Sequence, residues 1–228
     1  MGVDAARSPG RLYAWLWFVG IFAALAYAGR FAGGIEEEDA EPLYEWSTGV
    51  LGLVQFGVVL GIILLIAIHA SKRELFALRR PTSWWRALGI SLLIYVGIVL
   101  LSLAMAPFFD PAEEQGLVPE TWPPPSAAAF ALNAFVVVAI APVIEELTFR
   151  GLGFSLLERY GSRVAIGGTA LAFTLAHGLI EAAPQIFALG LGLAYLRHRL
   201  NSVYPSILLH ASFNAIALAF AALSARGS

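Results

Sequence analysis

Residues 127–151 read AAAFALNAFVVVAIAPVIEELTFRG, an apolar run that ends in two adjacent glutamates, Glu145 and Glu146, followed by Arg150. An ionised side chain at bilayer depth costs roughly 2.5 kcal/mol or more, so it needs a charge partner or a function. On a helix, Glu146 and Arg150 lie four residues apart on one face and can form an ion pair. Glu145 lies about 100° away round the helix and has no such partner. This stretch alone leaves two interpretations open: a functional cluster inside the membrane, or ordinary helix-end charges among lipid headgroups.

The composition of the chain is typical of a membrane protein. Of the 228 residues, 59% are hydrophobic and 13% are charged, about half the charged share of a soluble domain. A net charge of −2 and a single lysine leave no basic face large enough to bind nucleic acid. The absence of cysteine excludes disulfides, thiolate metal sites and a cysteine nucleophile.

The apolar runs along the chain predict an all-α, polytopic transmembrane bundle of about seven helices, within a range of six to eight. The predicted spans cover residues 12–29, 47–70, 87–107, 127–144, 164–180, 184–197 and 203–223. For the first run a retained helix is favoured over a signal sequence, because the run is long and aromatic. Residues 145–160 form either an interfacial helix or an extension of the fourth span, and we expect the extension. The chain is treated as one membrane domain, with helices 1–3 in residues 1–126 and the polar motifs in residues 127–228.

The charges of the loops predict the orientation in the membrane. Residues 30–46 and 108–126 are acidic, whereas residues 71–86 carry one lysine and four arginines. By the positive-inside rule the basic loop is cytoplasmic, so the N-terminus is cytoplasmic and both acidic loops lie outside. We therefore expect a multi-pass protein of the cell (cytoplasmic) membrane. Abundant alanine and arginine with scarce lysine favour a GC-rich bacterial source.

Two further polar pairs lie in the apolar spans. Phe173 precedes His177 by four residues, and His210 precedes Asn214 by four residues, so each pair projects from one helix face. A single histidine in a membrane helix is more often a packing residue with a satisfied hydrogen bond than a functional one. Three polar sets in one small bundle favour a functional site.

The chemistry that fits these side chains is activation of water. A glutamate shielded from solvent can take a proton from water and pass it to a leaving amine. A histidine can hold the same water, and an amide with a second imidazole can donate hydrogen bonds to an oxyanion. The aspartyl design of intramembrane protease is excluded because all three aspartates lie outside the spans, and the His-Glu-x-x-His zinc design is absent. A serine–histidine dyad is not excluded, but it leaves the two glutamates without a role.

The three motifs together resemble the type II CAAX prenyl endopeptidases, also called the CPBP or ABI family of intramembrane proteases. That family carries Glu-Glu-x-x-x-Arg, then Phe-x-x-x-His, then His-x-x-x-Asn or a similar polar residue, each on a membrane helix, and this chain has all three in that order within residues 127–217. The resemblance implies a helical bundle with a cavity, in which Glu145 with His177 activates water while His210 and Asn214 stabilise the oxyanion. The remaining motif residues are expected to shape the site: Glu146, Arg150 and Phe173.

The resemblance also sets expectations for cofactors and partners. No cofactor is expected, but zinc is not excluded, since Glu145, His177 and His210 are possible zinc ligands. The expected partners are a membrane protein or peptide substrate and the lipid bilayer. C-terminal tail processing is one activity found among relatives, and the oligomeric state is not predicted.

Two other hypotheses are a non-enzymatic membrane scaffold or self-immunity protein, and a proton-coupled carrier. A carrier is considered because a buried carboxylate with histidines can also relay protons. A carrier predicts inverted repeats with broken helices, which the sequence does not display.

Overall fold

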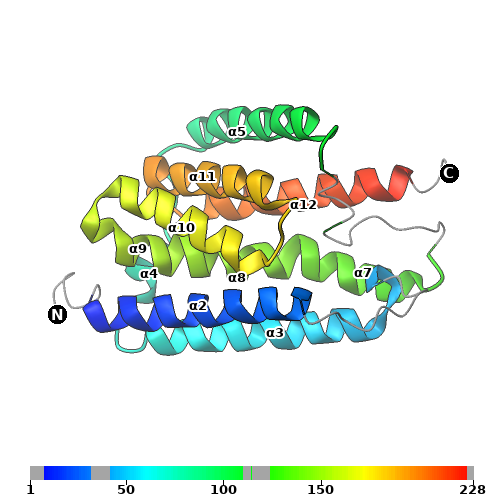
Figure 1. Ribbon diagram of the computed structural model, residues 1–228. Coiled ribbons are helices and arrows are strands. Elements are labelled where there is room, and N and C mark those ends of the chain that lie inside the picture. The colour runs from blue at the N-terminus through cyan, green and yellow to red at the C-terminus, as the bar shows by residue number, and fades with distance from the viewer. Residues whose placement is uncertain (1–7, 32–41, 110–113, 115–123, 225–228) are drawn as a thin grey trace.

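The computed structural model describes residues 8–31, 42–109, 114 and 124–224, which form an all-helical bundle without strands (Figure 1). The prediction of an all-α bundle of about seven helices is confirmed. Most of the acidic residues used to orient the chain, including those at 36–39, lie outside the described residues. The main helices are α2 (Pro9–Phe31), α3 (Trp46–Ile66), α5 (Trp84–Met105), a long helix over Ala127–Tyr160, α10 (Ser162–His177), α11 (Ala183–Leu200) and α12 (Tyr204–Ser224).

Five of these helices are long and apolar enough to cross a membrane, so the chain is a multi-pass membrane protein. They are α2, α3, α5, the long helix and α12. The predicted fifth and sixth spans form α10 and α11, but neither is among the five. With 16 residues, α10 is shorter than the roughly 20 residues that a span needs. The last turn of α11 carries Arg197 and Arg199. The two helices pack against each other, and each also has exposed apolar side chains, such as Leu171 on α10 and Phe187 on α11.

The long helix decides where the motif glutamates lie. It begins after Ser126, whose hydroxyl accepts a hydrogen bond from the Ala129 N–H at 3.3 Å. It ends before Gly161, whose φ of 105° is a conformation that favours glycine. The predicted extension of the fourth span past Arg150 is therefore confirmed. Because the helix has 34 residues, Glu145 lies near its middle, about 22 Å along the axis from Tyr160.

Two π-helical turns interrupt this helix on either side of the glutamates. A π-helical turn holds one residue more than an α-helical turn, which widens the helix and leaves backbone groups without their usual partners. Such turns are frequent at functional sites. In order, the segments are α7 (Ala127–Phe135), the π turn η2 (Val136–Ile140), α8 (Ala141–Glu146), the π turn η3 (Leu147–Gly153), α9 (Phe154–Leu157) and the 3₁₀ turn η4 (Glu158–Tyr160).

The long helix runs through the middle of the bundle (Figure 1). The first two membrane helices, α2 and α3, lie along one side of it, while α11 and α12 lie along the other, and α5 packs against α11 and α12. Helix α10 packs against both α11 and α2. Arg11 joins the start of α2 to the end of α3 by donating hydrogen bonds to the carbonyls of Ile66 and Ile68. The motif-bearing segments α8, α10 and α12 therefore meet in the interior of the bundle.

The contact between α2 and η3 depends on one tryptophan. Trp15 is fully buried, and its indole N–H donates a 3.0 Å hydrogen bond to the carbonyl of Thr148 in η3. The ring also lies edge-on to Phe149, with 6.4 Å between ring centroids. Gly153 makes room for it, because a Cβ at this position would lie 2.3 Å from the indole ring. Trp15 thus fixes the first membrane helix against the segment that follows the glutamates.

Replacing Trp15 by phenylalanine is expected to destabilise the protein. Loss of the indole N–H leaves the Thr148 carbonyl buried without its partner, at a cost of about 1–3 kcal/mol. The measurement is unfolding of the purified protein in mixed micelles, followed by circular dichroism. Trp17→Phe is the matched control, because Trp17 lies on the same helix with 72% of its surface exposed. Equal destabilisation by both substitutions would contradict the role assigned to the indole hydrogen bond.

Candidate active site

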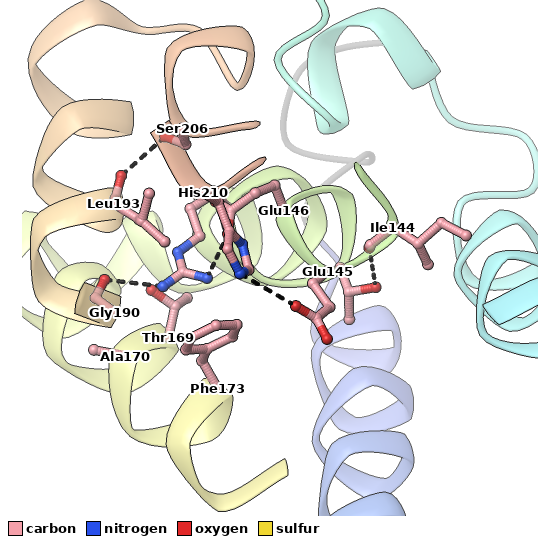
Figure 2. Close-up of polar contacts among 12 residues, drawn as sticks. Ile144, Glu145, Glu146, Thr169, Ala170, Phe173, Gly190, Leu193, Ser206 and His210 are labelled. Atoms are coloured by element: carbon pink, nitrogen blue, oxygen red, sulfur yellow. Dashed lines mark hydrogen bonds and ion pairs between the residues drawn. The ribbon is translucent and has the colours of Figure 1, made fainter. Parts of the chain in front are cut away.

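Glu146 and Arg150 form a fully buried ion pair at the centre of the bundle (Figure 2). The Arg150 Nη1 donates to Glu146 Oε1 at 2.9 Å, and its Nη2 donates to the carbonyl of Gly190 on α11 at 3.0 Å. The guanidinium lies 4.3 Å from the ring centroid of Phe173, which is a cation–π contact. The pairing expected from the spacing of four residues is present, and it connects the long helix with α10 and α11.

The His210 ring links this ion pair to the second glutamate. Its Nδ1 lies 3.1 Å from Glu146 Oε1, the oxygen that also accepts from Arg150. A carboxylate oxygen in an ion pair accepts hydrogen bonds, so Nδ1 carries the proton and donates. The other ring nitrogen, Nε2, lies 3.7 Å from Glu145 Oε2. Two atoms at this separation can contact one shared water, because each is within hydrogen-bond reach of a point between them.

His177 is oriented by its own helix. Its Nδ1 lies 2.7 Å from the carbonyl of Phe173, and since a carbonyl only accepts, Nδ1 donates this bond. The Nε2 of the neutral ring therefore carries a lone pair. The rings of Phe173 and His177 pack edge to face at 4.5 Å, and Phe173 also contacts the ring of His210 at 5.6 Å. Phe173 thus separates the two imidazoles and contacts both.

Asn214 holds the first π turn. Within η2 the N–H of Ala141 bonds the carbonyl of Val136, five residues back. The next residue, Pro142, has no N–H, so the carbonyl of Val137 lacks the corresponding partner. The Asn214 Nδ2 donates to that carbonyl at 2.9 Å. One amide hydrogen of Asn214 is therefore engaged in shaping the backbone, and its second hydrogen is available to a ligand.

These contacts gather the three motifs into one cluster, and the comparison with family models agrees. Residues 127–216 match the Rce1-like family of type II CAAX prenyl endopeptidases. The recognition drawn from the motifs is confirmed for the part of the chain that carries them. By its description the family consists of endopeptidases, which supports peptidase activity in general for this chain. Neither the comparison with curated proteins nor that with solved structures found a match.

Two residues that the sequence analysis did not identify hold the Rce1-like region in place. The buried Arg197 donates its Nε hydrogen to the carbonyl of Arg150 at 3.1 Å, and Trp15 donates to the carbonyl of Thr148. Both carbonyls belong to η3, so side chains from α11 and α2 fix this turn from two sides. In the sequence Arg197 has the pattern of an ordinary helix-end charge, as the exposed Arg199 does. Trp15 lies before the Rce1-like region, among other aromatic residues of α2.

Glu145 and His177 both face two adjoining cavities. The larger, of about 360 Å³, is also lined by His210 and Asn214 from α12 and by Gln185 from α11. The smaller, of about 210 Å³, lies between α2, α3 and the long helix. The predicted catalytic side chains Glu145, His177, His210 and Asn214 therefore border one space, while Phe173 forms part of its wall. Glu146 and Arg150 are buried behind it.

Glu114, from the loop between α5 and α7, closes one side of the larger cavity. Its carboxylate accepts hydrogen bonds from the N–H groups of Ile180 and Ala182 at 2.9 and 2.8 Å, and it pairs with Arg30 at 2.7 Å. Burial by itself raises the pKa of Glu114, but these backbone donors and Arg30 outweigh it, so the pKa lies below its usual value. The turn between α10 and α11 is thus joined to α2 through Glu114.

The three side chains named as possible zinc ligands, Glu145, His177 and His210, border the larger cavity. Nδ1 of His177 bonds the carbonyl of Phe173 and Nδ1 of His210 bonds Glu146, so Nε2 is the nitrogen that each ring leaves to a ligand. Among the described residues, no group of three or more His, Cys, Asp or Glu side chains is close enough to hold one metal ion. The mechanism proposed below involves no metal.

Proposed function

We propose that the protein is a glutamate-type intramembrane endopeptidase that hydrolyses a peptide bond in membrane-associated proteins or peptides. The observation that carries this proposal is that the two neighbouring glutamates have different surroundings. Glu146 is paired with Arg150 at 2.9 Å and fully buried, whereas Glu145 borders both cavities together with His177. One carboxylate is therefore held in an ion pair, and the other is accessible to water and substrate.

Glu145 acts first as the general base. A water molecule in the larger cavity donates one hydrogen bond to the Glu145 carboxylate and another to the Nε2 lone pair of His177. As the water oxygen attacks the scissile carbonyl carbon, its proton passes to Glu145. The product of this step is a tetrahedral intermediate with a negative oxygen. No covalent bond to the protein forms.

His210 and Asn214 stabilise that oxygen. The second amide hydrogen of Asn214 is not needed for the Val137 carbonyl and can donate to the oxyanion. His210 donates Nδ1–H to Glu146, so it contributes Nε2–H only as an imidazolium. Both donors are fixed before substrate binds, which is the condition for strong oxyanion stabilisation.

The reaction ends with collapse of the intermediate. The carbon–nitrogen bond breaks, Glu145 returns its proton to the leaving amine, and the carboxylate of Glu145 is restored. The products are a new C-terminal carboxyl group and a new amine, and the proton that the carboxyl group releases is taken up by the amine. Overall, one water is consumed for each peptide bond, and the protein is unchanged.

We further propose that the protein works in the cytoplasmic membrane, with its N-terminus in the cytoplasm. Basic residues gather at the end of the bundle where α2 begins, and there Arg79 joins α4 (Lys72–Leu75) to the end of α11 by donating to the carbonyl of Asn201 at 2.9 Å. Positive charge of this kind favours the cytoplasmic side. Processing of the C-terminal tails of membrane proteins is the favoured form of the activity, in keeping with the family description.

The test compares the termini of membrane proteins in cells that carry wild-type protein or Glu145→Gln at matched expression. We expect a set of new N- and C-termini that is present only with the wild type. Such termini would also identify the substrate. Identical sets of termini, under conditions in which cells require the protein, would overturn the endopeptidase and favour a scaffold or a carrier.

Asn214→Ala is expected to lower kcat by about 10²–10³ with little change in KM, because one oxyanion donor is lost. The same change leaves the Val137 carbonyl without its partner, so Tm should also fall. Cleavage of a substrate found by the terminus comparison measures the first effect, and thermal unfolding measures the second. Ser212→Ala, an exposed position on the same helix, is the control. A lower Tm with an unchanged kcat would leave Asn214 with a structural role only.

A further inference from the structure

The smaller cavity is a separate space with its own chemical character. Helices α2 and α3, which precede the Rce1-like region, supply Phe18, Phe22, Phe56 and Val59 to its wall. The long helix adds Phe149. Apart from Glu145 and His177, its polar lining residues are Gln55 and Thr148, and the Thr148 hydroxyl already donates to the Ile144 carbonyl at 2.7 Å. The wall is therefore mostly aromatic and apolar up to the point where it meets the reacting groups.

The smaller cavity lies directly beside the proposed reacting groups. Glu145, His177 and Phe56 line both cavities, so the two spaces adjoin at the proposed base. A group that fills the smaller cavity must lie against Glu145 and His177. The larger cavity holds the polar side chains that can bind a peptide backbone, among them Gln185 and Asn214.

The volume limits what the smaller cavity can hold. A dry cavity of about 150 Å³ lined by apolar side chains binds one benzene molecule. A volume of about 210 Å³ therefore suits one large aromatic or branched aliphatic side chain.

We propose that the smaller cavity is the specificity subsite of the endopeptidase: it binds one large apolar side chain of the residue directly beside the scissile bond. This inference rests on the proposed function, since it assigns the substrate class of the same site. The substrate is then a peptide segment chosen by a single apolar side chain. Its main chain lies in the larger cavity, and helices outside the Rce1-like region set the preference.

Two substitutions change the size of the subsite in opposite directions. Val59→Phe fills the cavity, and Phe22→Ala enlarges it. Each has a control on the same helix that points away from the cavity: Val58→Phe at a site that is 57% exposed, and Phe31→Ala at a site that is 73% exposed. Phe22 is only partly buried, so Phe22→Ala tests the proposal even if Val59→Phe fails to fold.

The first measurement is cleavage of a peptide mixture from a digested proteome by full-length protein in micelles, with cleavage sites mapped by mass spectrometry. The wild type should favour Phe, Leu, Tyr or Trp on one side of the cleaved bond. Val59→Phe should lower the preference for Phe over Ala at least about tenfold, the scale on which pocket size discriminates side chains. Phe22→Ala should shift the preference to larger residues, and both controls should match the wild type. Unchanged preferences in folded, active Val59→Phe and Phe22→Ala would overturn the subsite and leave the endopeptidase intact.

The second measurement needs no catalysis and separates the two proposals. N-acetyl-L-phenylalaninamide should raise the Tm of the Glu145→Gln variant, whereas N-acetylglycinamide should not. The rise should disappear when Val59→Phe is added and persist when Val58→Phe is added. Absence of any rise would overturn the subsite. A rise that follows this pattern, together with wild-type protein that cleaves no peptide, would uphold an apolar-residue binding site and overturn the endopeptidase.

Discussion

Glu145→Gln is expected to lower kcat by about 10³–10⁴ while Tm stays close to that of the wild type. The amide keeps the size of the side chain but cannot take a proton from water or return it to the leaving amine. Stability should persist because the structural ion pair is formed by the neighbouring Glu146 with Arg150. The measurement is single-turnover cleavage of an identified substrate, with thermal unfolding of the same preparation.

Glu158→Gln is the matched control for this prediction. Glu158 lies on the same continuous helix, in η4 at its end, and does not line either cavity. The Glu158→Gln protein should cleave the substrate at the wild-type rate. A Glu145→Gln protein with more than about a tenth of the wild-type kcat would remove Glu145 as general base, because that loss is far below the usual contribution of such a group.

Arg150→Met is expected to reduce the free energy of unfolding by about 3–5 kcal/mol. The substitution leaves the Glu146 carboxylate buried beside His210 without the guanidinium that neutralises it. It also removes the hydrogen bond to the Gly190 carbonyl and the contact with Phe173. Denaturant-induced unfolding in mixed micelles measures the change.

The control for Arg150→Met is Arg199→Met, which removes an exposed arginine from α11 and should change the stability by less than about 0.5 kcal/mol. The double variant Glu146→Gln/Arg150→Met removes both charges together. It should be less destabilised than the sum of the single variants, with a coupling energy of about 1–3 kcal/mol. If the double variant loses as much stability as the two single variants together, Glu146 and Arg150 do not stabilise each other.

The sequence predicted the parts of the site that follow from helical periodicity. Glu146 with Arg150, Phe173 with His177 and His210 with Asn214 are each four residues apart, and each pair lies on one helix face in the structure. The extension of the long helix past Arg150 was predicted although Gly151 and Gly153 lie in it. His177 is expected about 20 Å along its own helix from the cytoplasmic end, and the glutamates reach that depth only if the long helix continues.

The rest depends on contacts between helices, which periodicity does not describe. Pro142 marks the end of η2 in the sequence, but no residue pattern marks η3. The donors to the backbone carbonyls of the two π turns, Asn214, Trp15 and Arg197, come from other helices. The smaller cavity requires that α2 and α3 lie beside the long helix, a pairing of distant segments. The short α10 was predicted as a span because its residues are apolar; in the structure it packs against α11 and α2, while Leu171 and Leu175 are exposed.

The π turn η2 determines the direction in which the side chains after it point around the axis of the long helix. Each residue of an α-helix advances the side chain by about 100°, so removing one residue from η2 would restore ordinary α-helical bonding and turn α8 by about that angle relative to α7. Asn133 on α7 would keep its hydrogen bonds to the carbonyls of Leu43 and Glu45, while Glu145 would point away from His177. A single-residue deletion can therefore leave the bundle assembled and the two glutamates facing the wrong neighbours.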